Sequence, residues 1–333
     1  MGETEEESIG VIFLNLGGPD SLQAVRPFLF NLFSDREIIR LGPPFFQKPL
    51  AWLISYFRSK KTKRLYSLIG GKSPILDITM AQAKALEELL NNNPFDSPLS
   101  NGGYRVVFKV FVGMRYWHPF IDEVVSEIYR NGVKKLVALS MYPQYSHATT
   151  GSSTSRLQKV ISGYPIEVLS ISSWFNHPLY IEALIDVIKK GLEGWGGVHV
   201  LFSAHNLPES LVKEGDPYIE QINGTIAEIT KRLNIQWDLS YQSKSGPVKW
   251  LKPSTEEMLE RLAEKGIKNI LIVPISFVSD HIETLYEIDI LYKGIASMLG
   301  LVLKRVDSLN THPLLIEALK DIVMKGLKEK GWI

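Results

Sequence analysis

A dense group of ionisable side chains follows the apolar residues 270–278. The apolar run predicts a strand covered on both faces, and in α/β proteins such a strand ends at a ligand crevice. A helix after this strand would place Asp280, Glu283 and Glu287 on one face, because they are three and four residues apart. Adjacent carboxylates repel one another unless they share protons or a cation. Apolar neighbours argue against a merely solvated acidic face, so these residues are the first candidate site.

A histidine ends another predicted strand in the same half of the chain. His205 follows the strand-like residues 198–204. The carboxyl ends of parallel strands meet at one edge of a sheet, so we expect His205 to lie near Glu283. An imidazole beside a carboxylate makes a proton-accepting pair or part of a metal site. The spacing alone leaves a purely structural histidine open.

Composition limits the classes of function. The chain has 333 residues, 45% of them hydrophobic, and is long enough for two domains. A net charge of +1 argues against a nucleic-acid partner. The absence of cysteine excludes disulfides and thiolate metal sites and suits a reducing compartment, so any metal must meet nitrogen or oxygen ligands. The acidic residues at 1–8 do not resemble a secretion signal, and no apolar run approaches about 20 residues. We therefore expect a cytoplasmic protein.

The order of elements predicts a duplicated α/β fold. Strand-like runs near 10–16, 105–112, 136–142 and 166–171 are followed by four more near 198–203, 237–242, 270–276 and 301–306, with helical patterns between most of them. Two sequence repeats, 176–186 with 311–321 and 132–137 with 266–271, have offsets of 135 and 134. They predict two similar domains, each with a four-stranded parallel sheet flanked by helices, and a ligand cleft between them. The His-Pro pairs at His177 and His312 are typical of helix starts.

The first half carries about fifty extra residues between Pro19 and Met80, because residue 10 aligns with residue 198. Within this insert, the aromatic and aliphatic residues 41–57 precede a basic run at 58–64. Such a composition is typical of a segment on an anionic membrane surface or a lid over a flat apolar ligand. A packed surface helix with a basic end remains the alternative.

Several turns of the first half offer donors to anionic groups. Gly-rich and hydroxyl-rich turns at 69–74 and 142–154 lie at strand-to-helix junctions. Arg115 can hold a carboxylate through two hydrogen bonds. Together with the aromatic residues nearby, these groups fit a large planar ligand that carries carboxylates.

The collected motifs resemble those of the ferrochelatase family, which inserts Fe2+ into protoporphyrin IX with release of two protons. The matching segments run in family order: LNLGGPD (14–20), IGGKSPI (69–75), MRYW (114–117), YPQYS (142–146), FSAH (202–205), YQSKSGP (241–247) and residues 273–287. The resemblance implies porphyrin in the cleft and a C-terminal helix that returns to the first domain. The implied domains are 1–178 with 309–333, including a hydrophobic lip at about 40–65, and 179–308.

The resemblance also implies residue roles. His205 and Glu283 become the catalytic pair and the metal ligands, and Asp280 and Glu287 extend an acidic path for protons or metal. The implied porphyrin contacts are Tyr66, Ser73, Arg115, Tyr116 and Trp250. Fe2+ is a substrate, and with no cysteine no iron-sulfur cluster is expected. The lip at 45–57 implies contact with the inner face of a membrane. Which of His205 and Glu283 removes the pyrrole protons stays open.

Three alternatives compete with this interpretation. The chain could act on coproporphyrin III or on another divalent metal. It could be a non-catalytic tetrapyrrole carrier, which would need no catalytic pair. A nucleotide-sugar transferase also places a site between two α/β halves, but it predicts nucleotide binding and no affinity for porphyrin.

Overall fold

The computed structural model describes residues 6–92, 105–244, 246 and 248–333. Most of the acidic N-terminal tail, and Ser245 and Pro247 of the YQSKSGP motif, lie outside the described residues. Eight strands lie close to the predicted positions: β1 (Glu6–Asn15), β2 (Arg105–Met114), β3 (Lys135–Ser140), β4 (Glu167–Ile171), β5 (Val198–His205), β6 (Trp237–Gln242), β7 (Asn269–Pro274) and β8 (Val302–Arg305).

Helices connect the strands and cover both sheets. They are α1 (Val25–Ser34), η1 (Pro44–Phe46), α2 (Gln47–Ser67), α3 (Ile75–Asn92), α4 (Ile121–Arg130), η2 (His147–Gly151), α5 (Ser152–Ile161), α6 (Pro178–Leu192), α7 (Glu209–Lys213), α8 (Tyr218–Thr230), α9 (Thr255–Glu264), η3 (Glu283–Tyr292), α10 (Lys293–Met298) and α11 (Pro313–Lys330). The short η1 is a 3₁₀-helix, whereas η2 and η3 are π-helices.

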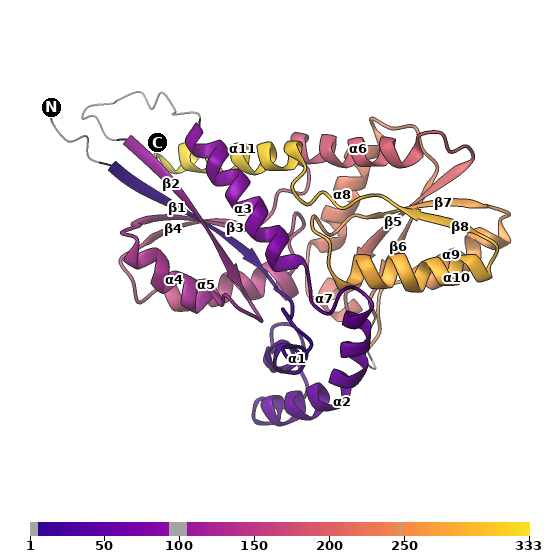
Figure 1. Cartoon of the computed structure of the whole chain (residues 1–333), viewed down its shortest axis with the longest axis horizontal. Coiled ribbons are helices and arrows are strands. Elements are labelled where there is room, and N and C mark those ends of the chain that lie inside the picture. The colour runs from indigo at the N-terminus through magenta and orange to yellow at the C-terminus, as the bar shows by residue number, and fades with distance from the viewer. Residues whose placement is uncertain (1–5, 93–104, 245, 247) are drawn as a thin grey trace.

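The strands form two parallel sheets of the same topology, which confirms the predicted fold class (Figure 1). The first sheet has the order β2-β1-β3-β4 and the second β6-β5-β7-β8. In each sheet the two central strands are β1 and β3, or β5 and β7, so their carboxyl ends adjoin. A side chain that follows β5 therefore lies beside the segment that follows β7.

Burial on both faces explains why the strands read as continuous apolar runs. In β1, Val11 and Phe13 pack toward α3, α6 and α11, whereas Ile12 and Leu14 pack toward α4 and α5. The core on the α6 and α11 side also takes in Val200 from the second sheet. One apolar core thus runs through both halves, and the predicted domain boundaries stay a prediction.

The duplication is real, but the predicted alignment of the first strands was wrong by one residue. Ile9 pairs with Lys135 in the first sheet, and Val198 pairs with Asn269 in the second. Because Lys135 and Asn269 are related by the repeat offset of 134, residue 9, not 10, matches residue 198. Apolar residues on both faces of β1 remove the alternation that would have fixed this register.

The two His-Pro motifs begin α6 and α11, as predicted, and each proline occupies the first turn. The motifs also bind each other's helices. His177 Nε2 lies 2.9 Å from Asp321 Oδ2, and His312 Nε2 lies 2.9 Å from Asp186 Oδ2. Two copies of one motif thus make a reciprocal clasp between the helices that bridge the halves.

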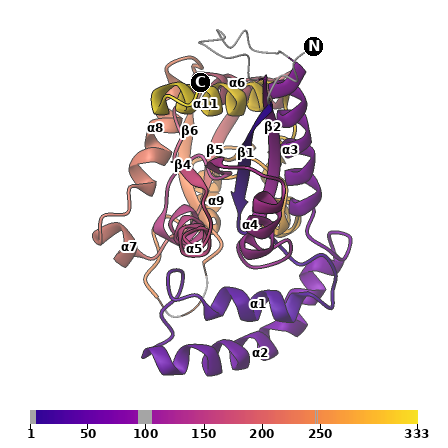
Figure 2. The same cartoon turned by 90° about the vertical axis from the view of Figure 1, so that its left-hand side faces the viewer.

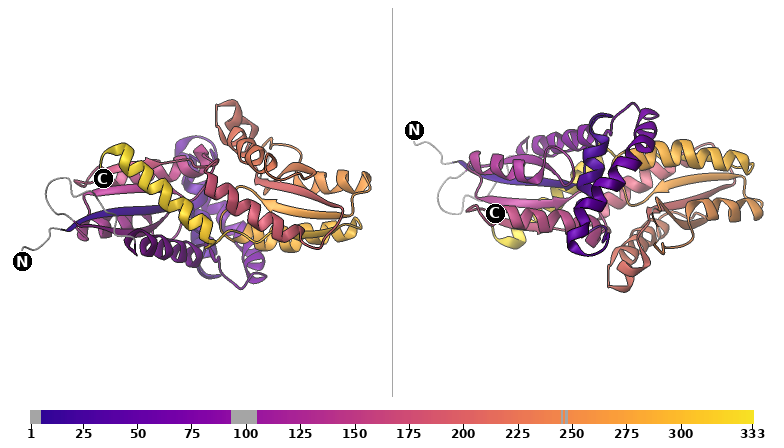
Figure 3. Two further views of the ribbon diagram at one scale, coloured as in Figure 1. Left: turned by 90° about the horizontal axis from the view of Figure 1, so that it is seen from above. Right: turned by 90° about the horizontal axis from the view of Figure 1, so that it is seen from below.

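The insert of the first half forms α1 and α2, which project from the body of the molecule (Figure 2). Seen from below, they cross the junction between the two halves (Figure 3). Phe45 and Phe57 are about 70% exposed, and Trp52 and Tyr56 stack on each other beneath the guanidinium of Arg26. These aromatic rings lie outside the core, as the sequence predicted.

Candidate active site

His205 and Glu283 form a direct contact at the carboxyl edge of the second sheet. His205 is the last residue of β5, and Glu283 begins η3 after β7. His205 Nδ1 lies 2.8 Å from Glu283 Oε2. The backbone of His205 is fixed on both sides, because its N–H donates to Ser276 Oγ (2.9 Å) and its carbonyl accepts from the Tyr218 hydroxyl (3.1 Å). The predicted neighbours are therefore brought together.

The contact sets the charge and tautomer of the pair. Burial alone would lower the pKa of His205, but Glu283 outweighs it and raises the pKa above its usual value. Burial opposes ionisation of Glu283 as well, yet His205 and the more distant His281 lower the pKa of that carboxyl. An ionised Glu283 accepts a hydrogen bond from Nδ1–H, so the neutral imidazole keeps its lone pair on Nε2. The free Nε2 can accept a proton or bind a metal.

Glu287 lies one turn along η3 and behaves oppositely to Glu283. Its carboxylate accepts a hydrogen bond from the Ser243 hydroxyl. Burial and the neighbouring Glu283 charge raise the pKa of Glu287 to about 7. Two carboxyls with pKa values shifted in opposite directions are typical of groups that exchange protons. The place of Glu287 on an acidic path stays a prediction.

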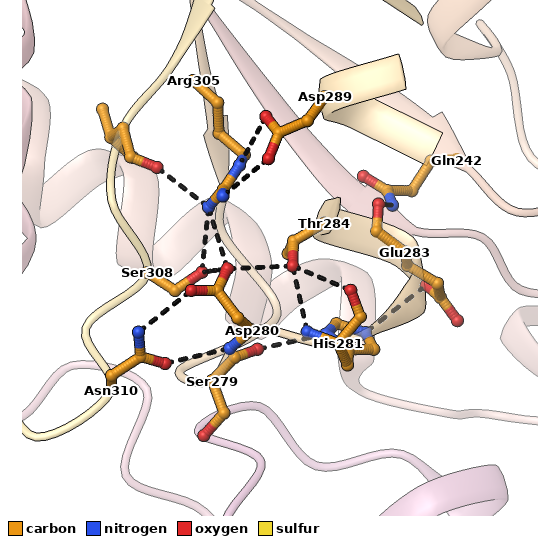
Figure 4. Close-up of polar contacts among 11 residues, drawn as sticks. Gln242, Ser279, Asp280, His281, Glu283, Thr284, Asp289, Arg305, Ser308 and Asn310 are labelled. Carbon is orange, nitrogen blue, oxygen red and sulfur yellow. Dashed lines mark hydrogen bonds and ion pairs between the residues drawn. The ribbon is translucent and has the colours of Figure 1, made fainter. Parts of the chain in front are cut away.

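Asp280 is surrounded by polar partners from β8, from the segment after it and from η3 (Figure 4). Its carboxylate accepts from Arg305 (3.0 Å), Ser308 (2.7 Å), Asn310 (3.0 Å) and Thr284 (3.0 Å). Burial raises the pKa of Asp280, but these partners outweigh burial and lower it. Within the described residues, no hydrogen bond joins Asp280 to Glu283 or Glu287. Asp280 precedes η3 instead of lying within it, so the predicted shared helix face does not extend to this residue.

A second histidine, which the sequence analysis left without a role, lies close to the pair. His281 Nε2 is buried without a hydrogen-bond partner and lies 4.0 Å from Glu283 Oε2. Its ring packs edge-on against Phe277, whose ring is 6.0 Å from that of His205. Phe277 and His281 line a small pocket with Asn15 and Tyr142 from the first half. Residues of both halves thus meet close to the pair, and a cleft large enough for a porphyrin stays a prediction.

Arg115 and Tyr116 belong to a polar network on the first half. Asp35 Oδ2 accepts from Arg115 Nη2 (2.6 Å), the Tyr116 hydroxyl (2.6 Å) and Ser152 Oγ (2.7 Å). Burial opposes the charge of Asp35, but these donors keep its pKa below the usual value. The side chain of Arg115 remains 20% exposed, whereas Tyr116 is buried. Arg115 can thus offer a remaining N–H to a ligand, while the hydroxyl of Tyr116 is already bound.

The three other predicted porphyrin contacts come from both halves: Tyr66 and Ser73 from the first and Trp250 from the second. Tyr66 and Ser73 are nearly buried, and the backbone of Ser73 donates to Pro19 O at 2.8 Å. Gly18 packs so closely on Ser73 that an added Cβ would lie 2.6 Å from its side chain. Trp250 pairs with Pro208 in the loop after β5, and its Nε1 is buried without a partner. Their contact with a porphyrin stays a prediction.

Asp35 was missed by the sequence analysis. It lies 80 residues before Arg115 in the chain, so no local spacing connects the two. The only available signal was that a strongly basic side chain at a strand end needs an acidic partner when it is buried.

Comparison with known proteins decides the family. The family model described as Ferrochelatase matches residues 8–327. The chain belongs to the ferrochelatase family. A ferrochelatase of Geobacter metallireducens is 49% identical over 96% of this chain and 99% of its own length. A ferrochelatase of Gloeothece citriformis is also 49% identical, over 97% of this chain and 84% of its own length. As a family member, the chain is a metal chelatase enzyme.

Solved structures show the ferrochelatase-family fold in more distant proteins. SirB from Bacillus subtilis with Fe3+ superposes with a TM-score of 0.56 at 12% identity, covering 97% of this chain and 98% of its own. A multi-domain protein from Deinococcus radiodurans, DR2241, described as similar to chelatases, gives a TM-score of 0.51 at 10% identity, over 96% of this chain and 55% of its own. At these identities the likeness concerns the fold alone.

Two further properties of the described residues bear on ligands. No group of three or more His, Asp or Glu side chains in that part of the chain is arranged to hold a metal ion. No helix among the described segments is long and apolar enough to cross a membrane.

Proposed function

We propose that this chelatase inserts Fe2+ into protoporphyrin IX, giving protohaem and two protons. The observation that carries the proposal is the His205–Glu283 contact of 2.8 Å, beside a pocket lined by both halves. Membership of the ferrochelatase family supplies the reaction class, the insertion of Fe2+ into a porphyrin. A tetrapyrrole carrier has no need for a base whose tautomer is fixed by a carboxylate.

The pair accounts for the proton handling that insertion requires. Each porphyrin must lose two pyrrole protons as the metal enters. The lone pair on His205 Nε2 accepts a proton, and the Glu283 carboxylate stabilises the imidazolium that results. Glu287, whose pKa of about 7 allows it to gain and lose a proton near neutrality, passes protons away from the pair. Nε2 can also hold Fe2+ before transfer, and Glu283, bound at Nδ1–H, then orients this imidazole ligand.

Anaerobic insertion assays test the proposal directly. Purified protein is mixed with Fe2+ and either protoporphyrin IX or coproporphyrin III, and porphyrin fluorescence and the haem spectrum are followed. We expect turnover of protoporphyrin IX and its loss in His205→Ala, with porphyrin binding retained. If coproporphyrin III is turned over faster, it is the substrate in place of protoporphyrin IX. Binding without insertion would favour a carrier.

We also propose that the lip at 45–57 rests on an anionic membrane surface, with the protein on the cytoplasmic side. The lip exposes Phe45, Trp52 and Phe57 and is followed by the basic run at 58–64. Aromatic rings beside basic side chains suit the interface of an anionic bilayer. Flotation with phosphatidylglycerol vesicles should recover the wild type but not a variant with Ser at these three positions.

Met298 provides a matched control for the vesicle experiment. It is 81% exposed but lies at the end of α10, away from the lip. Met298→Ser should leave flotation unchanged. Equal loss in both variants would mean that general surface hydrophobicity, rather than the lip, drives association.

A further inference from the structure

One guanidinium holds both flanks of the segment that carries the catalytic carboxylates. Arg305 is the last residue of β8, and its side chain is only 10% exposed. Its Nε and Nη2 donate to the two oxygens of Asp289 at 3.0 and 2.8 Å. Its Nη1 lies 3.0 Å from Asp280 Oδ1 (Figure 4). Asp280 precedes Glu283 by three residues, and Asp289 follows Glu287 by two.

Further hydrogen bonds transmit this hold to the backbone. Thr284 Oγ1 donates to Asp280 at 3.0 Å and accepts from the backbone N–H of His281 at 3.0 Å. Asn310 accepts from the backbone N–H of Asp280 and donates to its carboxylate. The entry to η3 is therefore tied to Asp280, and Asp280 is tied to Arg305. A planar fork with several fixed donors suits such a junction better than a flexible ammonium.

The first half shows that a π-helix can form without this clamp. By strand register and the repeat offset of 134, the positions of Asp280, Asp289 and Arg305 correspond to Ser146, Ser155 and Ser170. All three charges are thus absent from the half that lacks the carboxylates. There the π-helix η2 has five residues, whereas η3 has ten. The clamp accompanies the longer π-helix and the acids that it carries.

We propose that Arg305 is a positioning residue for metal insertion: by binding Asp280 and Asp289 it holds η3 so that Glu283 meets His205 Nδ1. The inference rests on the proposed function of the pair and assigns Asp280 to the clamp in place of the acidic path. The polar partners of Arg305 are Asp280, Asp289, Val306 and Ser308, and none of them is His205 or Glu283, so Arg305 acts through the position of Glu283. Small displacements of a catalytic group reduce rates strongly without removing ligand contacts.

The test compares Arg305→Gln in two backgrounds. In the wild type, we expect kcat for Fe2+ insertion to fall about 10- to 100-fold, with the KM for porphyrin changed less than about twofold. In the Glu283→Gln background, Arg305→Gln should lower kcat little further, because the group that it positions is already disabled. An equal fall in both backgrounds, or an unchanged kcat in the wild type, would overturn the proposal.

Arg156→Gln is the matched control, because Arg156 makes the same two-pronged contact with Asp122 between α5 and α4 of the first half. It should leave kcat unchanged. If Arg305→Gln does not fold, Asp289→Asn replaces it. This substitution weakens one arm of the clamp at a carboxylate that is 37% exposed, and a normal kcat there would overturn the clamp.

A spectroscopic measurement separates failure of this inference from failure of the proposed function. The hydrogen-bonded Nδ1–H proton of His205 should give a downfield resonance that is absent in His205→Ala. We expect Arg305→Gln to weaken or abolish it and Arg156→Gln to retain it, whether or not the protein inserts iron. Retention in Arg305→Gln would refute positioning, and a wild type without insertion would refute only the proposed reaction.

Discussion

In each half a π-helix follows the third strand, but the side chains in these two segments differ in chemistry. At the offset of 134, His281 corresponds to His147 and Thr284 to Thr150, so part of the segment is the same in both. Glu283 and Glu287, however, correspond to Thr149 and Ser153. Both segments contain a π-helix. The duplicated scaffold thus presents hydroxyls on one side of the cleft and carboxylates on the other.

The neighbouring strand shows the same division. Register places Leu16 of the first half where the second has His205. The first-half hydroxyls are taken up in structural contacts: Ser146 Oγ donates to Asp216 of the second half at 2.9 Å, and Ser140 and Thr150 share a hydrogen bond of 2.8 Å. In contrast, the second-half groups His205 and Glu287 both have raised pKa values. In the proposed mechanism, the first half holds the ligand and the second half handles the protons.

The largest expected difference between the halves is in kcat, when residues at matched positions are substituted. Glu283→Gln should lower kcat for insertion by about 10²- to 10⁴-fold, because the amide no longer stabilises the His205 imidazolium. Thr149→Val, at the matched position, should change kcat less than about threefold. Stopped-flow haem formation and fluorescence titration of porphyrin measure both. Similar losses in the two variants would show that the halves share the chemistry.

The holding role of the first half can be tested through charge. The double variant Arg115→Met, Asp35→Asn removes the ion pair without leaving a buried charge. It should weaken binding of protoporphyrin IX by about tenfold, because one charge-assisted hydrogen bond to a carboxylate is lost. The dimethyl ester of the porphyrin should bind both proteins alike. If binding of the ester is weakened by the same factor, Arg115 supports the wall of the binding site and does not bind a carboxylate.

The sequence was sufficient for features that depend on local patterns. Apolar runs located the strands closely, and parallel topology then brought His205 to Glu283 across 78 residues. The strand register was missed because β1 is buried on both faces. Asp280 was placed on a helix face because α-helical spacing was assumed for a segment that enters a π-helix only at Glu283. Asp35 and Arg305 were missed because their partners are set by tertiary packing.

A smaller effect should follow from Glu287, whose pKa of about 7 is raised by burial and by Glu283. If Glu287 must be ionised to accept protons, kcat of the wild type rises as pH increases through about 7. In Glu287→Gln, kcat at high pH should be a fewfold lower than in the wild type, and kcat should no longer rise through about pH 7. Ser153→Ala, at the matched position, should retain the rise. A pH profile that is the same in wild type and Glu287→Gln would remove Glu287 from the path.

The raised pKa of Glu287 also affects stability, with a definite sign. The folded protein favours the protonated form, so it loses stability as pH rises from about 4.5, where the unfolded carboxyl ionises, to about 7. Glu287→Gln should therefore raise the free energy of unfolding at pH 8, on the order of 1 kcal/mol, and have little effect at pH 4. Urea unfolding at the two pH values measures this difference. A variant less stable than the wild type at pH 8 would contradict the prediction.

The smallest difference is expected in the clasp, where both halves supply the same motif. His177 bonds Asp321, a residue with a 63% exposed carboxylate, whereas His312 bonds Asp186 and also accepts from the Leu314 N–H at 3.3 Å. Exposed pairs contribute little, but a helix cap contributes about 1 kcal/mol. His312→Ala should therefore lower the urea midpoint more than His177→Ala does. Equal midpoints would mean that the cap adds nothing and that the two motifs, unlike the sites beside them, have remained equivalent.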